Sequence, residues 1–157
     1  MLTKKKIMKM QRLLLGASLF SFLFFGCKKN TSTTNYWSVN GKVHNASHVY
    51  WIDQFGFIAT DFDNNNILIN FYSDSVSSGQ YSVVNDSTSI SSLPKTACTI
   101  TGYLVNMAPF GSLGKTGDLI NFSTPITKQT FTAIFNNITV KDTSNNIYFI
   151  SGNLTLH

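Results

Sequence analysis

Glutamate is absent from this sequence, and its single arginine is Arg12. A protein that binds nucleic acid needs a basic stripe to neutralise phosphates, and arginine is the preferred reader of bases. Residues 27–157 carry seven lysines and seven aspartates, so this part is formally neutral although the whole chain has a net charge of +5. The composition therefore excludes nucleic acid as an expected partner.

Cysteine is also scarce, with only Cys27 and Cys98 present. Cys98 lies in the apolar run Ala97–Ile100. A nucleophilic cysteine needs a cationic or histidine neighbour that lowers its pKa, whereas a free thiol in an apolar run packs as a small hydrophobic group. We expect the second role for Cys98.

Long apolar runs are limited to one, Leu13–Phe25. It has about 13 residues, which fits the apolar region of a signal peptide (roughly 7–15) and is too short to span a bilayer. Gly26 and Cys27 follow it, and the sequence then becomes polar. The cations that precede it, with no acidic residue among them, are Lys4, Lys5, Lys6, Lys9 and Arg12. The pattern predicts an export signal.

The end of this signal, Phe24-Phe25-Gly26-Cys27, resembles a bacterial lipobox, with Phe24 where leucine is usual. The resemblance implies diacylglyceryl transfer to the Cys27 sulfur, cleavage before it, and acylation of the new amino terminus. We therefore predict a signal peptide over residues 1–26, an acylated cysteine and flexible tether over 27–35, and a single domain over 36–157. Lipid at Cys27 would hold the protein on a membrane and would leave Cys98 as the only free cysteine, so no intrachain disulfide is expected. Lys28 is not the aspartate of an inner-membrane retention signal, so the resemblance favours the outer membrane.

Alternation with a period of two dominates from Tyr36 onward, and helical spacing never persists for three turns. Short alternating segments with turn residues roughly every 8–12 positions are typical of β-sandwiches and barrels. We predict an all-β domain, an antiparallel β-sandwich or partly open barrel of about nine short strands. The expected strands are residues 36–39, 42–44, 48–60, 67–72, 79–84, 97–105, 119–122, 130–141 and 146–156.

Hairpin patterns are clearest at the two ends of the domain. Asn40-Gly41, between the first two expected strands, is a strong signal for a tight hairpin turn. In the last expected strand, Ile150 and Leu154 alternate with polar residues such as Thr155. This alternation predicts that Ile150 and Leu154 point into the core and that Thr155 points to solvent.

Four short motifs extend the resemblance over nearly the whole chain. They are Gly26–Lys29 at the end of the signal, Val39–Lys42 in the first hairpin, Gly79-Gln80-Tyr81 in mid-domain, and Ser151–Leu154 near the end. Together they resemble the small β-sandwich lipoproteins of Bacteroidota. The resemblance implies an all-β envelope lipoprotein and brings no catalytic residues that can be carried over.

The segment Pro109–Thr116 contains the glycines and the lysine of a phosphate-binding loop. Pro109 takes the place of the first required glycine and has no N–H to offer a phosphate, and the residues that follow indicate a strand rather than a helix. We expect residues 109–117 to form a glycine-rich surface loop.

Two other groups of polar residues resemble incomplete metal sites. Asp61, Asp63 and Asn65 have the spacing of the first calcium ligands in an EF-type loop, but the later glycine and glutamate are missing, so we expect an Asx-rich turn. His44 and His48 would share one face of a straight strand, which gives at most a partial zinc set, and we expect solvated or edge-strand histidines. No metal and no cofactor is predicted.

Aromatic residues are abundant, and most of them are expected in the core. Trp37 and Trp51 lie near the starts of expected strands, where an exposed ring could face a ligand. This leaves two alternatives open, a binding or structural β-sandwich and an open-barrel carrier of a small apolar ligand or glycan.

Asp74-Ser75-Val76 and Asp86-Ser87-Thr88 resemble the three-residue O-glycan acceptor of Bacteroidota, and both fall in expected loops. Ser75 and Ser87 are therefore candidate acceptors. No catalytic carboxylate pair or Ser-His-Asp arrangement is indicated by spacing. We predict a lipid-anchored envelope protein that is not an enzyme and whose partner is an unknown protein or glycan.

A shortened protein that begins at Thr34 should still unfold cooperatively as an all-β domain, because no alternating strand begins before Tyr36. Urea unfolding followed by circular dichroism, compared with a chain that begins at Lys28, measures this. An insoluble or molten shorter chain beside a well-folded longer one would place the domain boundary earlier.

Overall fold

A computed structural model describes residues 35–52, 56–72, 77–123 and 130–156. These residues form eleven strands and one short 3₁₀ turn, Ile90–Ser92. The strands are β1 (Tyr36–Val39), β2 (Lys42–Asn45), β3 (His48–Trp51), β4 (Gly56–Thr60), β5 (Asn66–Phe71), β6 (Gly79–Val83), β7 (Ala97–Tyr103), β8 (Phe110–Ser112), β9 (Leu119–Ser123), β10 (Phe131–Asp142) and β11 (Ile147–Leu156). The all-β prediction is confirmed, with eleven strands in place of about nine.

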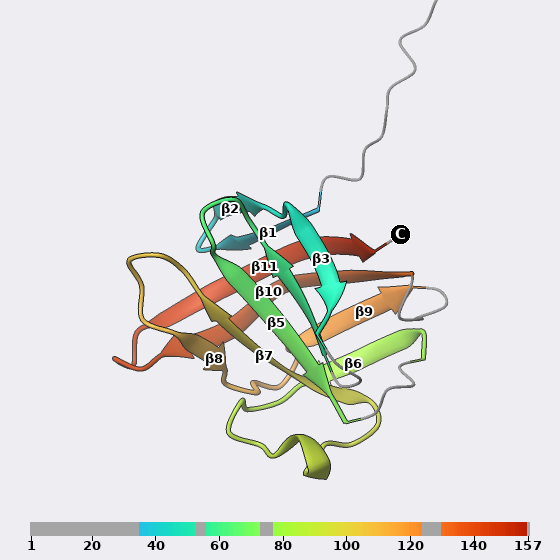
Figure 1. The fold of residues 1–157 in the computed structure, drawn as a ribbon. Coiled ribbons are helices and arrows are strands. Elements are labelled where there is room, and N and C mark those ends of the chain that lie inside the picture. Colours follow the sequence, from blue (N-terminus) through green and yellow to red (C-terminus); the bar gives the residue numbers. More distant parts are fainter. Residues whose placement is uncertain (1–34, 53–55, 73–76, 124–129, 157) are drawn as a thin grey trace, which may run out of the picture. The chain divides into compact units, whose positions relative to one another are not determined.

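Five of the strands close into a barrel. β10 pairs with β9, β9 with β6, β6 with β7, β7 with β8, and β8 again with β10. The pair β6–β7 is parallel and the others are antiparallel. Strands β11, β1 and β2 continue outward from β10, and β5, β4 and β3 continue outward from β7. Figure 1 shows the layer with β3, β5 and β7 crossing in front of the layer with β10 and β11.

The predicted first hairpin is confirmed. β1 and β2 pair with Val39 opposite Lys42, and the two residues between them have positive φ, 47° at Asn40 and 81° at Gly41. Positive φ at both central residues is the requirement of the turn that best matches the twist of paired strands, and asparagine followed by glycine meets it at low cost.

The prediction of one strand over residues 48–60 is wrong. β3 and β4 are separate strands that pair with each other, with His48 opposite Thr60 and Trp51 opposite Phe57. The Ile52 N–H donates to the Gly56 carbonyl at 3.1 Å and closes this hairpin. Both strands have similar apolar and aromatic composition, so the only interruption between them in the sequence is the polar pair Asp53-Gln54 ahead of Gly56.

The predicted glycine-rich surface loop over residues 109–117 is also corrected. Its first part is β8, whose three residues are all buried and which closes the barrel between β7 and β10. Phe110 lies directly on Gly102 of β7, in the space that a side chain at position 102 would occupy. A strand of three residues is too short to show an alternating pattern.

The closing hairpin forms as predicted, with β10 and β11 paired along most of their length. Ile150 and Leu154 are fully buried. Thr155 is also buried, contrary to the prediction that it faces solvent. Asn35 covers it from the start of the domain, because the Asn35 side chain accepts from the Thr155 N–H at 2.5 Å and donates to the Thr155 carbonyl at 2.8 Å.

Aromatic rings fill the space between the layers. Phe57 of β4 meets Phe131 of β10 with ring centroids 4.3 Å apart. Phe71 of β5 contacts Phe122 of β9 at 5.3 Å and Tyr81 of β6 at 5.6 Å, both nearly edge-to-face. Rings at these separations add stabilisation beyond the area they bury, so this cluster couples the outer strands to the barrel.

Truncating Ile150 should destabilise the domain by about 2–5 kcal/mol, the usual loss for a buried isoleucine replaced by alanine. Ile147 lies on the same strand but is 44% exposed, so Ile147→Ala should cost well under half as much. Urea unfolding of the two variants gives the comparison. Equal losses would show that the inward face of β11 is misassigned.

Candidate binding groove

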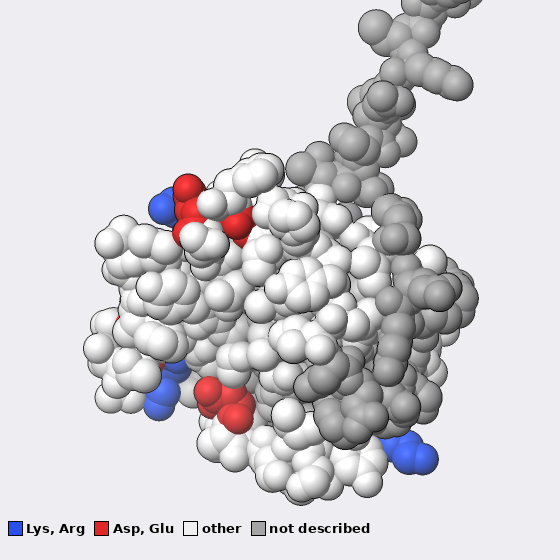
Figure 2. All heavy atoms as spheres, viewed as in Figure 1, with Lys and Arg blue, Asp and Glu red and all other residues white. Residues whose placement is uncertain are grey.

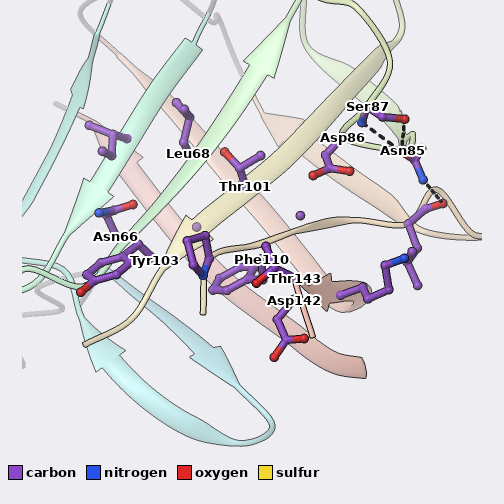
Figure 3. A pocket seen from close by; sticks show the side chains of 16 residues that line it. Asn66, Leu68, Asn85, Asp86, Ser87, Thr101, Tyr103, Phe110, Asp142 and Thr143 are labelled. Carbon is purple, nitrogen blue, oxygen red and sulfur yellow. Dashed lines mark hydrogen bonds between the residues drawn. The ribbon is translucent and has the colours of Figure 1, made fainter. Parts of the chain in front are cut away.

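A groove lies on the outer face of β4, β5 and β7, with a cavity volume of about 680 Å³ (Figure 3). Its floor is a row of outward side chains on neighbouring strands, with Ile58 opposite Leu68 and Leu68 opposite Thr101. The next row places Asn66 opposite Tyr103. The inward residues of the same strands belong to the core, so the alternation of β5 and β7 places the groove residues on the solvent side.

The loop after β6 forms a wall of the groove and carries Asp86. The Asp86 N–H donates to the Ser112 carbonyl of β8 at 2.9 Å. The Asp86 side chain then lies over Gly111, in the space that any side chain at position 111 would need. Figure 3 shows the carboxylate end of Asp86 directed toward the side of the groove that carries Thr101.

Neighbouring polar groups hold this loop in one conformation. The Asn85 side-chain oxygen accepts from the Ser87 N–H at 2.9 Å and from the Ser87 hydroxyl at 2.6 Å. The buried Ser112 hydroxyl donates to the Val84 carbonyl at 2.6 Å and accepts from the Ile100 N–H at 3.1 Å. The loop is therefore anchored to both β7 and β8, which fixes the backbone that carries Asp86.

A second groove, of about 580 Å³, is lined by His44 among other residues. The His44 Nδ1 lies 3.0 Å from the Asp61 Oδ2, and the imidazole stacks on Trp37 with ring centroids 5.4 Å apart. The Nε2 atom of His44 is buried and has no hydrogen-bond partner among the described residues. His44 is 6% exposed, so it is not a solvated histidine, but β2 is an edge strand of the sheet and the edge-strand alternative of the prediction is confirmed.

Asp61 is the centre of a compact hydrogen-bonded turn. Its Oδ1 accepts from the N–H groups of Asp63 and Asn65, both at 2.9 Å, and its Oδ2 accepts from the Asn65 side-chain amide at 2.7 Å. Burial raises the pKa of Asp61, but the hydrogen bonds from Asn65, His44 and Asp63 together outweigh burial and lower the pKa below its ordinary value. The predicted Asx-rich turn is confirmed.

The same turn occurs again at Asp142, between β10 and β11. Asp142 Oδ1 accepts from the N–H groups of Ser144 and Asn146, and its Oδ2 accepts from the Asn146 amide, all at 2.8 Å. The Tyr148 hydroxyl donates to Oδ2 at 3.0 Å, in the role that His44 has at Asp61. Hydrogen bonds from Asn146 outweigh desolvation and lower the pKa of Asp142. Both turns follow the pattern Asp-x-x-Asn-Asn, which is visible in the sequence.

Asn65 also positions the segment that separates the two grooves. Its side-chain oxygen accepts from the Val105 N–H at 2.7 Å. Val105 and Met107 line the second groove, while Tyr103 and Pro109 on either side of this segment line the first. The Asp61 turn therefore supports one wall of both grooves.

The two tryptophans predicted as ligand-facing line neither of these grooves. Trp37 is 0% exposed, so it is a core residue and the prediction is wrong for it. Trp51 is partly buried, and its ring lies 5.9 Å from that of Phe57 and 5.8 Å from that of Phe131. Both rings are on the inward side of their strands, where the layers meet.

The other predicted positions are distributed as follows. Ser87 is exposed at the rim of the first groove and stays a predicted O-glycan acceptor. Ser75 and Cys27 lie outside the described residues. His44 and His48 belong to different strands, β2 and β3, and do not share a face of one strand. Cys98 is buried, as expected, and burial raises its pKa.

Sequence reasoning missed the four polar residues that define the first groove, which are Asp86, Asn66, Thr101 and Tyr103. Asp86 was noted only as part of the acceptor motif of Ser87. For Asn66, Thr101 and Tyr103 the sequence does contain a signal, because alternate positions of two strands, Asn66-x-Leu68 and Thr101-x-Tyr103, share the outward face. It becomes informative only when β5 and β7 are known to be neighbours.

Comparison with known proteins found no matching family model, no matching curated protein and no matching solved structure. Within the described ranges, no three His, Cys, Asp or Glu side chains gather closely enough to hold a metal ion. In the same ranges, no helix has both the length and the apolar composition that crossing a membrane requires. The fold and the groove together define an all-β barrel with extended outer strands and a polar surface site.

Lowering the pH should weaken the domain through Asp61. Its pKa is lower in the folded state than the ordinary value of about 3.9 in the unfolded chain. As the pH falls toward and below this ordinary value, the unfolded chain binds more protons than the folded one, so the free energy of unfolding decreases. Asp61→Asn removes this contribution, so its free energy of unfolding should fall less steeply between about pH 5 and pH 3.

Urea unfolding at a series of pH values measures these slopes. The matched control is Asp63→Asn, which changes an exposed carboxyl in the same turn that accepts none of the hydrogen bonds described for Asp61. It should keep the slope of the unmodified protein. A slope that is unchanged in Asp61→Asn would contradict the role assigned to this carboxylate.

Proposed function

We propose that this protein is a lipid-anchored lipoprotein of the cell envelope, in the outer membrane, whose β-domain is a non-enzymatic binding module. The observation that carries the proposal is the order of features in the sequence. A cationic segment, the apolar run Leu13–Phe25 and Gly26-Cys27 are followed by a short polar stretch and then by the first strand, which begins at Tyr36. This is the order expected of an acylated cysteine, a tether and an exported domain.

Lipid at Cys27 supplies the membrane affinity in this proposal. Residues 27–157 are formally neutral, so they offer no excess of positive charge to anionic lipids. Each buried methylene of an acyl chain contributes about 0.8 kcal/mol, and one chain alone gives marginal binding while two or more anchor stably. The triacylated cysteine of a bacterial lipoprotein meets this requirement.

The chemistry of the side chains supports binding rather than catalysis. The carboxylates of Asp61 and Asp142 accept hydrogen bonds within their turns, and that of Asp118 accepts from the Thr139 N–H at 3.1 Å. Cys98 is buried in the core with a raised pKa, which keeps it a thiol. These groups act as structural elements, while the polar residues of the first groove remain open to a ligand.

The rival role, an open-barrel carrier, requires a cavity inside the barrel. Inward side chains from all five barrel strands belong instead to one packed core, among them Tyr81, Ile100, Phe110, Ile120 and Val140. A surface groove is therefore the better-supported binding site.

Replacing Cys27 by serine should abolish lipid attachment, because it removes the sulfur that accepts the diacylglyceryl group. Metabolic labelling with a palmitate analogue, followed by detergent partition of the envelope fraction, measures this. The unmodified protein should take up label and enter the detergent phase, and Cys27→Ser should lose the label.

The matched control is Cys98→Ser, which removes the other sulfur and should leave labelling intact, since that thiol is buried. Label on Cys27→Ser, or none on the unmodified protein, would refute the lipoprotein assignment.

A further inference from the structure

We propose that the groove on the outer face of β4, β5 and β7 binds a neutral saccharide. In this assignment the Asp86 carboxylate is the main acceptor for sugar hydroxyl groups, and the Tyr103 ring packs on a face of the sugar. The inference deepens the binding role proposed above and rests on it. It follows from the unused polar groups, the exposed ring, the charge balance and the rigidity of the groove.

Four polar side chains of the groove have no internal partner among the described residues. Within the part of the chain that the structure describes, the side chains of Asp86, Asn66, Thr101 and Tyr103 make no hydrogen bond. They offer a carboxylate that only accepts, an amide that donates and accepts, and two hydroxyls that do both. Sugar hydroxyls are also donors and acceptors at once, so a saccharide can pair with all four groups.

Tyr103 supplies an aromatic surface beside these groups. Its side chain is 42% exposed, and it lies opposite Asn66 in the strand register, with Leu68 and Thr101 in the adjacent row. One face of a pyranose ring carries mostly C–H groups and packs on an aromatic ring, while its hydroxyls point sideways to polar neighbours. A half-exposed tyrosine next to an amide, in a groove that also carries a hydroxyl and a carboxylate, matches this division.

The charges in the groove disfavour an anionic ligand. Asp86 contributes one free carboxylate, and Lys141 of β10 lines the same groove. The carboxylate of Asp142, also in the lining, is occupied by hydrogen bonds within its turn. Figure 2 shows that the face turned toward the viewer carries few charged side chains. An anionic ligand would therefore meet one cation, Lys141, and two anions, Asp86 and Asp142, with no net attraction.

The position of the groove argues against an extended peptide. A peptide strand binds most often by pairing with the free edge of a sheet. The strands under the groove have no free edge there, because β4 pairs with β3 and β5, and β5 pairs with β4 and β7. Recognition must come from side chains that stand on the face of the sheet, as it does for a saccharide.

The groove is also rigid before binding. Asn85 and Ser112 fix the loop that carries Asp86, and Gly111 leaves the space in which its side chain lies. A site that is already ordered loses less conformational entropy when a ligand binds. This matters for saccharides, since each of their hydrogen bonds replaces one made with water.

The test uses the full-length protein in detergent on an array of defined oligosaccharides. The array holds neutral glucans, mannans, galactans and xylans, together with uronic-acid and sulfated glycans. Binding to at least one neutral oligosaccharide is expected, and calorimetric titration with that oligosaccharide then gives its Kd. Binding to none of the neutral oligosaccharides, or to the anionic glycans alone, would overturn the proposal.

Variants assign the bound oligosaccharide to this groove. Asp86→Asn should weaken binding about tenfold or more, as expected for a hydrogen bond to a charged group, and Tyr103→Ala by about two- to tenfold. Thr101→Val removes one hydroxyl at nearly constant volume and should also weaken binding. The matched controls are Asp63→Asn and Tyr36→Ala, an exposed carboxyl and an exposed tyrosine outside the groove, which should bind like the unmodified protein.

Thermal unfolding of each variant shows whether it is folded. If Asp86→Asn does not fold, the affinity of Thr101→Val tests the site in its place. Unchanged affinity in the folded groove variants would refute the site. Lipid labelling of the unmodified protein is measured independently. Saccharide binding without lipid label refutes only the anchor, and lipid label without saccharide binding refutes only the saccharide site.

Discussion

Contacts between aromatic rings hold the two layers of this domain together, and the surface depends on them. Phe57 and Phe131 meet at 4.3 Å between β4 and β10, and Phe71 continues the cluster to Phe122 of β9. Edge-to-face packing of this kind constrains the orientation of each ring as well as its depth of burial. The strands that carry Phe57 and Phe71 are β4 and β5, and their opposite faces are the floor of the groove. The interior therefore determines where the outward side chains Leu68 and Asn66 are presented.

Aspartate has two separate uses in a domain that contains no glutamate. Asp61 and Asp142 each accept four hydrogen bonds within or next to a hairpin turn, so their carboxylates stabilise backbone that would otherwise lack partners. Asp86 accepts none among the described residues and faces an open groove. The short aspartate side chain suits the first use because it reaches the N–H groups two and four residues further along the chain. The contrast between these residues separates structural carboxylates from one that is available to a ligand.

Sequence patterns predicted the all-β class, the Asn40-Gly41 hairpin and the closing hairpin, because each depends on neighbours along the chain. They failed where a feature depends on distant partners. Phe110–Ser112 is a strand only because β7 and β10 lie on either side of it. Thr155 is buried where Asn35 bonds to its backbone and Thr132 of β10 lies beside its hydroxyl. The groove was missed for the same reason, since Asp86 and Thr101 come together through pairing that no local pattern encodes. Asparagine was used as a turn signal only in part, at Asn40 and in the Asp61 turn, although every non-glycine residue with positive φ in the described ranges is an asparagine.

The pairing of β1 with β11 has a consequence for how the domain forms. Asn35 bonds to Thr155 across 120 residues, and the sheet beside β11 stays incomplete until both ends of the domain are present. Bringing such distant segments together costs chain entropy before any contact compensates for it, and topologies dominated by non-local pairing fold in milliseconds to seconds rather than microseconds. For the export proposed above, this order of assembly means that the sheet beside β11 cannot be completed before the last strand has been transported.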